Sequence, residues 1–109
     1  MKRETIGEFE ELCLLMVGIL HEEAYGVSVK DEIKNRTGRD VTISSIHSTL
    51  VRLEKKGLLK SSMGGANDIR GGRAKRIFEM TAAGKQTINE ARELRNQLWT
   101  DIPKLVWEK

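Results

Sequence analysis

The 109-residue sequence has few of the residues that mark a secreted, membrane-spanning or metal-binding protein. Its single cysteine, Cys13, cannot form an internal disulfide, which fits a reducing cytoplasm and a packing role. No apolar run approaches the ~20 residues of a membrane-spanning helix, and the charged start MKRE is unlike a signal peptide. The two histidines, His21 and His47, are far apart and form no metal-ligand pattern. We therefore expect a cytoplasmic protein with no metal, no cofactor and no membrane partner.

Positive charge is concentrated in the middle of the chain. Residues 1–42 carry six basic and nine acidic side chains, for a formal charge of −3. Residues 43–77 carry eight basic and two acidic side chains (+6), and residues 78–109 carry five of each (0). The total of +3 says little by itself, but a basic central block is typical of a surface that binds a polyanion.

The stretch 43–59 predicts a short helix with two unlike faces, followed by a glycine stop and a strand. At 100° per residue, one face carries Ile46, Leu50 and Leu53, and the opposite face carries Ser44, Ser48, Val51, Arg52 and Lys55. We expect Ser44 to cap this helix and Gly57 to end it in the left-handed conformation. A helix with one narrow apolar stripe and outward hydroxyls and cations suits a DNA major groove.

Residues 5–22 predict the first helix, with Thr5 and Glu8 as a capping box. Its expected apolar stripe consists of Phe9, Leu12, Leu15 or Met16, Ile19 and Leu20. Leu14 and Val17 widen this stripe beyond the needs of one core. Either part of the helix packs on a second chain, or it is a central core helix with extra apolar cover.

Ala24-Tyr25-Gly26 predicts a turn before a second helix, which runs from about Val27 to Thr37 and ends at Gly38. This helix has few apolar residues. It could lie across a DNA backbone as the first helix of a helix-turn-helix, or serve as a solvated support. Residues 41–43 form a short β-prone run that leads into the central helix.

Two strand-like segments, 58–62 and 76–80, enclose the glycine-rich loop 63–75. Three helices followed by a hairpin predict a winged helix-turn-helix, so the expected fold class is mainly α (α+β). The cations Arg70, Arg73, Lys75 and Arg76 suit phosphates or a minor groove, although a solvated loop would also carry them. The sequence contains neither GxxxxGK[ST] nor GxGxxG, which argues against nucleotide binding.

Thr81 predicts the N-cap of a long final helix that must stop or kink before Pro103. Its apolar stripe consists of Ile88, Ala91, Leu98 and Ile102, flanked by Leu94 and Trp99. This helix either packs back on the first helix or pairs two copies of the chain. We expect a homodimer, with contacts from Phe9, Ile88, Ala91, Leu94, Leu98, Trp99 and Ile102.

Several of these motifs together resemble the short form of the PadR-type transcriptional regulators. They are Ala24-Tyr25-Gly26, Ile46-x-x-Thr49-Leu50-x-Arg52-Leu53-Glu54-x-x-Gly57-Leu58, Gly71-Gly72-Arg73-x-Lys75-Arg76 and Thr81-Ala82-x-Gly84. The resemblance implies a bacterial, homodimeric, DNA-binding transcription factor, usually a repressor. It places a winged-helix domain at 1–80, with a recognition helix at about 44–56 and a wing at about 61–78. A C-terminal dimerisation helix, part of the same compact unit, would occupy 81–109.

The residues expected to bind DNA are Ser44, Ser45, His47, Ser48, Thr49, Arg52, Lys55, Lys56, Arg70, Arg73, Lys75 and Arg76. His47 stands near a position where the family commonly has tyrosine, and it is either a DNA contact or a half-buried helix residue. The resemblance also implies a candidate aromatic or drug-like effector, for which Trp99 could be a binding residue or plain interface packing. Double-stranded DNA with an inverted-repeat operator is the expected partner.

Two other functions have less support in the sequence. A winged-helix protein-interaction module without DNA binding has no need of the +6 block at residues 43–77. An enzyme would need a catalytic set, and the sequence has no Ser/His/Asp order, carboxylate pair or metal cluster that stands out.

Overall fold

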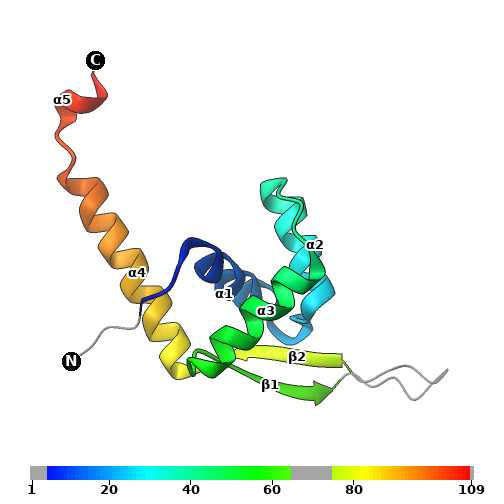
Figure 1. Cartoon of the computed structure of the whole chain (residues 1–109). Coiled ribbons are helices and arrows are strands. Elements are labelled where there is room, and N and C mark those ends of the chain that lie inside the picture. The colour runs from blue at the N-terminus through cyan, green and yellow to red at the C-terminus, as the bar shows by residue number, and fades with distance from the viewer. Residues whose placement is uncertain (1–4, 65–74, 109) are drawn as a thin grey trace.

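The structure, a computed structural model, describes residues 5–64 and 75–108 (Figure 1). Its elements are α1 (Glu8–Leu20), η1 (His21–Glu23), α2 (Gly26–Thr37), α3 (Ile43–Lys55), β1 (Leu59–Gly64), β2 (Lys75–Met80), α4 (Ala82–Asp101) and α5 (Lys104–Trp107). The two strands form one antiparallel sheet. The mainly α fold, a winged helix-turn-helix followed by a long helix, confirms the prediction.

The core lies where α1, α2 and α3 meet and is closed by the base of the hairpin. Its largest fully buried side chain is Phe78 on β2. From α3 it receives Ile46, Leu50 and Leu53, each 0% exposed, so the stripe predicted for this helix is confirmed. Burying one such aliphatic side chain stabilises a fold by about 1.5–3 kcal/mol. The core therefore fixes which face of α3 remains outside.

The buried face of α1 differs from the predicted one. Glu10, Cys13, Leu14, Met16 and Val17 are buried, whereas Leu15 and Ile19 are 42% and 48% exposed. The predicted stripe was therefore wrong at Ile19, and of the two alternatives Leu15 and Met16 it is Met16 that lies in the core. Because α1 is apolar on nearly all sides, its periodicity does not select the face, and packing against α2 and α3 decides it.

Two helices begin at residues other than the predicted caps. Thr42, not Ser44, caps α3, and its Oγ1 accepts from the backbone N–H of Ser45 at 3.1 Å. Gly7, not Thr5, precedes α1, and its backbone N–H donates to Glu10 Oε1 at 2.9 Å. The β-prone run at 41–43 forms no strand, because it supplies the cap and first residue of α3. The predicted end of α3 is confirmed.

The turn Ala24-Tyr25-Gly26 joins the helices to the wing. The backbone N–H of Phe78 donates to the carbonyl of Ala24 at 2.8 Å, so β2 is anchored beside this turn. Lys75 Nζ lies 4.1 Å from the centre of the Tyr25 ring, a cation–π contact. Gly38 ends α2 with φ 75°, as the sequence predicted.

The long helix α4 starts on the winged domain and then leaves it (Figure 1). Thr81 caps it as predicted, with Oγ1 accepting from the N–H of Gly84 at 3.0 Å. The helix ends at Asp101, ahead of Pro103. The Cα radius of gyration is 16.7 Å, whereas a compact domain of this length has roughly 13 Å.

In the described parts of the chain, no single helix is long and apolar enough to cross a membrane. Residues Glu8–Glu23 and Gly26–Thr37 have that length and apolar content only when taken together, and this pair is bent by 120°.

Candidate nucleic-acid interface

A groove lies between the outward face of α3 and the base of the wing. It has a volume of about 690 Å³ and is lined by His47, Ser48, Val51, Arg52, Lys55 and Arg76. Five of these residues come from α3 and one from β2. Four of the six carry a cationic or ionisable nitrogen, and none carries a carboxylate. The helix and the wing therefore build one electropositive concave surface.

The first two turns of α3 present hydroxyl groups. Ser44, Ser45 and Ser48 are exposed, and Ser44 Oγ lies 3.3 Å from Thr42 Oγ1. His47 is exposed as well, so it is not the half-buried residue that the sequence left as an alternative. These side chains can donate or accept hydrogen bonds, which is the chemistry that base edges and phosphates require.

Thr49 is a correction to the predicted surface. It is 3% exposed, and its Oγ1 donates to the Ser45 carbonyl at 2.9 Å within α3. A hydroxyl that is buried and paired with its own helix cannot reach a base edge in this conformation. Thr49 therefore lies on the buried side of α3 and has a structural role there.

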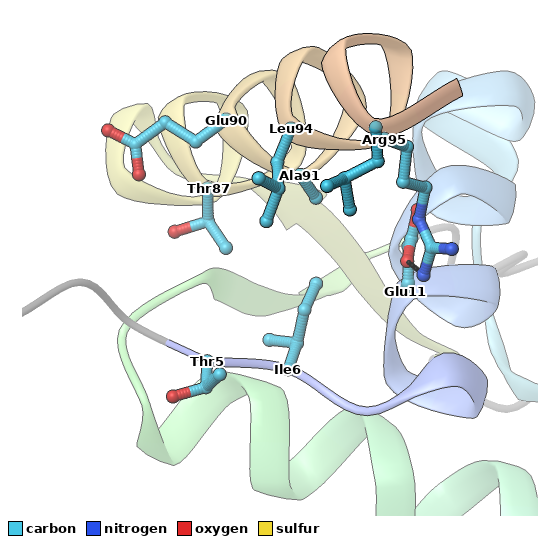
Figure 2. Close-up of a pocket in the computed structure, with 9 residues that line it drawn as sticks. Thr5, Ile6, Glu11, Thr87, Glu90, Ala91, Leu94 and Arg95 are labelled. Carbon is cyan, nitrogen blue, oxygen red and sulfur yellow. Dashed lines mark hydrogen bonds and ion pairs between the residues drawn. The ribbon is translucent and has the colours of Figure 1, made fainter. Parts of the chain in front are cut away.

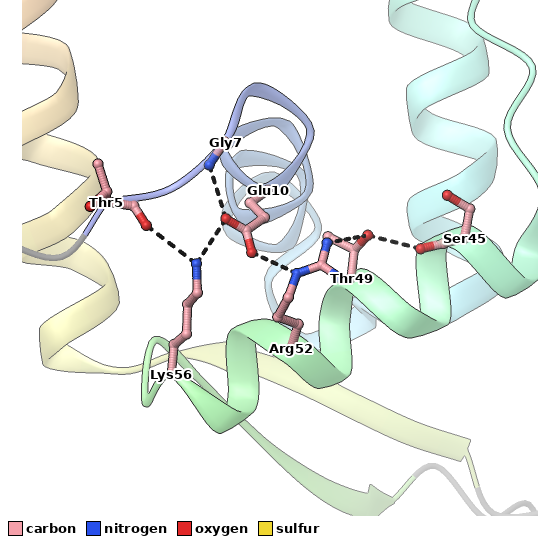
Figure 3. Close-up of polar contacts among 7 residues, drawn as sticks. All are labelled: Thr5, Gly7, Glu10, Ser45, Thr49, Arg52 and Lys56. Atoms are coloured by element: carbon pink, nitrogen blue, oxygen red, sulfur yellow. Dashed lines mark hydrogen bonds and ion pairs between the residues drawn. The ribbon is translucent and has the colours of Figure 1, made fainter.

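Arg52 and Lys56 both bind one carboxylate on α1 (Figure 3). Arg52 Nε donates to Glu10 Oε2 at 2.8 Å, and Lys56 Nζ donates to Glu10 Oε1 at 3.0 Å. Lys56 Nζ also donates to the Thr5 carbonyl at 3.2 Å. The Lys56 side chain is 28% exposed and the Arg52 side chain 52%, so Arg52 is the more available to a ligand.

The hydrogen-bond partners of Glu10 stabilise its negative charge. Burial by itself raises the pKa of Glu10, but hydrogen bonds from the Gly7 N–H, Arg52 and Lys56, with the positive charge of Lys56, outweigh it. The net result is a pKa lowered from 4.5 to about 2. Glu10 is therefore ionised at neutral pH, although its side chain is only 9% exposed.

A second carboxylate holds the wing cation. Arg76 Nη2 donates to Glu54 Oε1, and Arg76 Nε donates to Ser61 Oγ at 3.0 Å. Ser61 Oγ in turn donates to Glu54 Oε2 at 2.7 Å. These contacts tie β1 and β2 to α3, so the wing base and the helix keep a fixed relation.

The remaining predicted cations differ in where they lie. Lys55 is exposed in the groove. Lys75 is exposed and lies over the Tyr25 ring. Arg70 and Arg73 lie outside the described residues.

The fold and this groove can be compared with known proteins. A model of the transcriptional regulator PadR-like family matches residues 14–90, which is more than half of the chain. The chain belongs to the PadR-like family of transcriptional regulators. This membership makes it a DNA-binding regulator by family.

The chain is also similar to individual known proteins, and the solved structures among them share its fold. An uncharacterised protein of Lysinibacillus sphaericus is 30% identical over 102 residues, covering 92% of this chain and 85% of that protein. The crystal structure of a PadR family transcriptional regulator from Eggerthella lenta superposes with a TM-score of 0.68 at 24% identity, covering 91% of this chain and 86% of the other. A PadR-like regulator from Bacillus cereus gives 0.67 at 20% identity, with 87% and 90% covered.

Sequence reasoning missed the two carboxylates that hold the arginines of this PadR-like protein. Glu10 falls on the buried face of α1, three residues before Cys13 and four before Leu14. A carboxylate in line with core residues requires a cationic partner, because an unpaired buried charge is costly. This spacing is visible in the sequence, but it becomes a signal only once the buried face of α1 is known. Glu54 gave none, because its partner Arg76 is 22 residues away.

The residues predicted for dimerisation fall into two groups in the single chain. Phe9 and Ile88 pack partly buried against the core, and Ala91 and Ile102 are half-buried. Leu94, Leu98 and Trp99 are 49%, 57% and 64% exposed. The Trp99 ring stacks on that of Trp107, with centroids 5.6 Å apart and planes at 8°.

Proposed function

We propose that this protein is a homodimeric, sequence-specific transcriptional repressor of a bacterial cytoplasm, released from DNA by a small-molecule or other signal. The observation that carries the proposal is the groove in which the outward face of α3 and Arg76 of the wing form one electropositive surface. The match of residues 14–90 to the family of PadR-like transcriptional regulators supports the DNA-binding part.

In the proposed complex, α3 enters the major groove, whose width admits an α-helix. The N-terminal half of α3 carries exposed polar side chains that can meet base edges: Ser44, Ser45, His47 and Ser48. The apolar Val51 can contact a thymine methyl group. Arg52 offers guanidinium nitrogens to a guanine or a phosphate. Lys55 supplies charge to the backbone.

The wing has a phosphate-binding role in this proposal. Arg76 is 38% exposed at the base of the wing, and Lys75 is exposed beside it. Because Glu54 and Ser61 fix Arg76, the distance between the wing contact and α3 is set before DNA arrives. A preset spacing reduces the entropy lost on binding.

The dimer is proposed from the surface of α4. Residues 92–101 are all exposed in the single chain, including Leu94, Leu98 and Trp99. The apolar Ile6, Ala91, Leu94 and Leu98 line one part of a cleft of about 310 Å³ beside α4, whose other lining residues are polar (Figure 2). An apolar surface of this kind on a projecting helix is typical of a protein–protein interface.

Two copies related by a two-fold axis would place two α3 helices on one side of the dimer. Such a dimer reads two half-sites in opposite orientation, so its operator is an inverted repeat. Occupying a promoter in this way blocks access to it, which is the simplest form of repression.

The effector is proposed to bind beside Trp99. A cleft of about 340 Å³ between α1 and α4 is lined by Trp99 together with Leu15 and Ile88, and it has the size of a small aromatic molecule. Titration with 8-anilinonaphthalene-1-sulfonate, an aromatic anion that suits Arg92 and Arg95 in the same lining, should quench tryptophan fluorescence in the wild type and much less in Trp99→Leu. Equal quenching in both proteins would remove Trp99 from the effector site.

Fluorescence anisotropy with labelled DNA tests the DNA-binding function. A fragment from the promoter of the protein's own gene should bind more tightly than a random fragment of equal length at physiological salt, and Arg52→Ala should reduce that preference. A good bidentate base contact is worth about 1–3 kcal/mol of discrimination. Binding to neither fragment would favour a protein-interaction module instead.

A further inference from the structure

We propose that Glu10 is a positioning residue for DNA recognition: its carboxylate holds Arg52 of α3 and Lys56, the C-cap residue of α3, against α1 and so fixes the Arg52 guanidinium before DNA binds. This inference rests on the proposed DNA-binding function. It adds a residue of α1, outside both the recognition helix and the wing, to the determinants of sequence specificity.

The Glu10 carboxylate accepts hydrogen bonds from three donors inside the protein and does not itself face DNA (Figure 3). Its Oε1 accepts from the Gly7 N–H at 2.9 Å and from Lys56 Nζ at 3.0 Å, and its Oε2 accepts from Arg52 Nε at 2.8 Å. The side chain is 9% exposed, so both oxygens are committed inside the protein. A buried carboxylate with this many donors is rigid, and so are the groups that it binds.

The orientation of Arg52 follows from which nitrogen is engaged. Nε is bonded to Glu10, and Nη2 lies 3.4 Å from Thr49 Oγ1, a longer and weaker contact. The terminal nitrogens Nη1 and Nη2 thus remain as the donors for a bidentate contact, while Glu10 fixes the rotation of the guanidinium plane. Because Thr49 is itself held by the Ser45 carbonyl, the support continues into the first turn of α3.

The same carboxylate lowers attraction to DNA in general. Its negative charge neutralises part of the charge of Arg52 and Lys56, which otherwise would pair with phosphates. A sequence-specific complex gains from the fixed guanidinium, since less side-chain entropy is lost when the contact forms. Binding to random DNA is not strengthened by the fixed guanidinium, because no matching base contact forms. Glu10 therefore lowers the affinity for DNA in general and raises the preference for the operator.

Glu10→Gln tests this role, because it keeps the shape of the side chain and removes the charge. Glu8→Gln is the matched control: Glu8 lies in the same first turn and loses the same charge, but its partner is Arg39 of the α2–α3 connection. The measurement is Kd for an operator selected by the wild type from random double-stranded DNA, and Kd for random DNA of equal length, over a range of salt concentrations. Melting curves show whether each variant folds.

For Glu10→Gln we expect the ratio of random to operator Kd to fall about 3- to 10-fold, the size of fixing one or two side chains. Binding to random DNA should be unchanged or tighter, with a steeper salt dependence, because Arg52 and Lys56 become available to phosphates. Glu8→Gln should keep the wild-type ratio. An equal loss of affinity for both DNAs, or an unchanged ratio, would overturn the positioning role.

Two further measurements separate this role from simple stabilisation. In an Arg52→Ala background, Glu10→Gln should change the ratio much less than in the wild type, because Glu10 acts mainly through Arg52. In the DNA-free wild type, ¹⁵N relaxation of the Arg52 Nε–H should report a rigid group, whereas a freely rotating one would refute the proposal without any variant. A wild type without preference for any operator would instead refute the proposed function itself.

Discussion

Gly84 of α4 lies against the backbone of Leu58, so close that a Cβ at Gly84 would be 2.2 Å from the Leu58 carbonyl oxygen. The same carbonyl accepts from the Thr81 N–H at 3.1 Å, and Thr81 Oγ1 donates to the Gly57 carbonyl at 2.7 Å. The start of α4 is therefore attached to the junction between α3 and β1. This attachment joins the projecting helix to the DNA-facing part of the molecule.

Gly84→Ala should destabilise the protein, because the added methyl group meets backbone that cannot move aside easily. Overpacking of this kind costs typically 1–3 kcal/mol, which should appear as a lower urea midpoint at an unchanged m-value. Ala83→Gly, one position earlier at an exposed site of the same helix turn, is the control for helix propensity alone. Wild-type stability in Gly84→Ala would contradict the close approach.

Glu10 should make folding stability fall with acidification. Its pKa is about 2 in the folded protein and 4.5 ordinarily, so the ionised form stabilises the fold above about pH 4.5. This contribution is lost as the pH falls from 4.5 toward 2, and it amounts to on the order of 3 kcal/mol. Urea unfolding of the wild type and Glu10→Gln across this range checks it. The two stability curves should converge at low pH, and parallel curves would contradict the assignment.

Cys13 should be inert while the protein is folded. Its side chain is 0% exposed, and burial raises the pKa of its thiol to about 12. The reactive thiolate is therefore scarce and shielded at neutral pH. Reaction with Ellman's reagent should be slow in buffer and rapid in denaturant. Rapid modification in buffer, with the melting temperature unaltered, would show that α1 is not packed in this way.

Leu98→Glu should dissociate the proposed dimer. Leu98 is 57% exposed on α4 in the single chain, and a charge placed in an apolar interface is costly. Sedimentation equilibrium should give the mass of a monomer for this variant and of a dimer for the wild type. Gln97→Glu, its neighbour with an exposed side chain, is the matched control and should stay dimeric. A monomeric wild type would refute the dimer.

Local signals in the sequence predicted much of the fold. The stripe of α3, the left-handed Gly57 with φ 80° and the Thr81 cap each depend on neighbouring residues, and each was predicted correctly. Thr49 also could have been placed. It lies about 40° around the helix from Leu53, which is buried, and its hydroxyl reaches a carbonyl of the preceding turn.

The rest depended on contacts between distant segments. The buried face of α1 could not be predicted, because apolar residues lie on most sides of that helix and its packing against other elements, chiefly α2, α3 and β2, determines which side is buried. The pairs Glu10–Arg52 and Glu54–Arg76 join residues 42 and 22 positions apart. No local pattern links such residues, so the support behind the groove emerged only in the structure.

Selection of bound sites from random double-stranded DNA, at physiological salt, tests the central claim most directly. The proposed homodimeric regulator predicts one enriched motif that is an inverted repeat, with half-sites about one or more helical turns apart, centre to centre. Arg52→Ala should lose preference at one symmetric pair of positions in this motif. No enrichment over the starting pool, or enrichment of a single asymmetric half-site only, would contradict a two-fold dimer that reads DNA through α3.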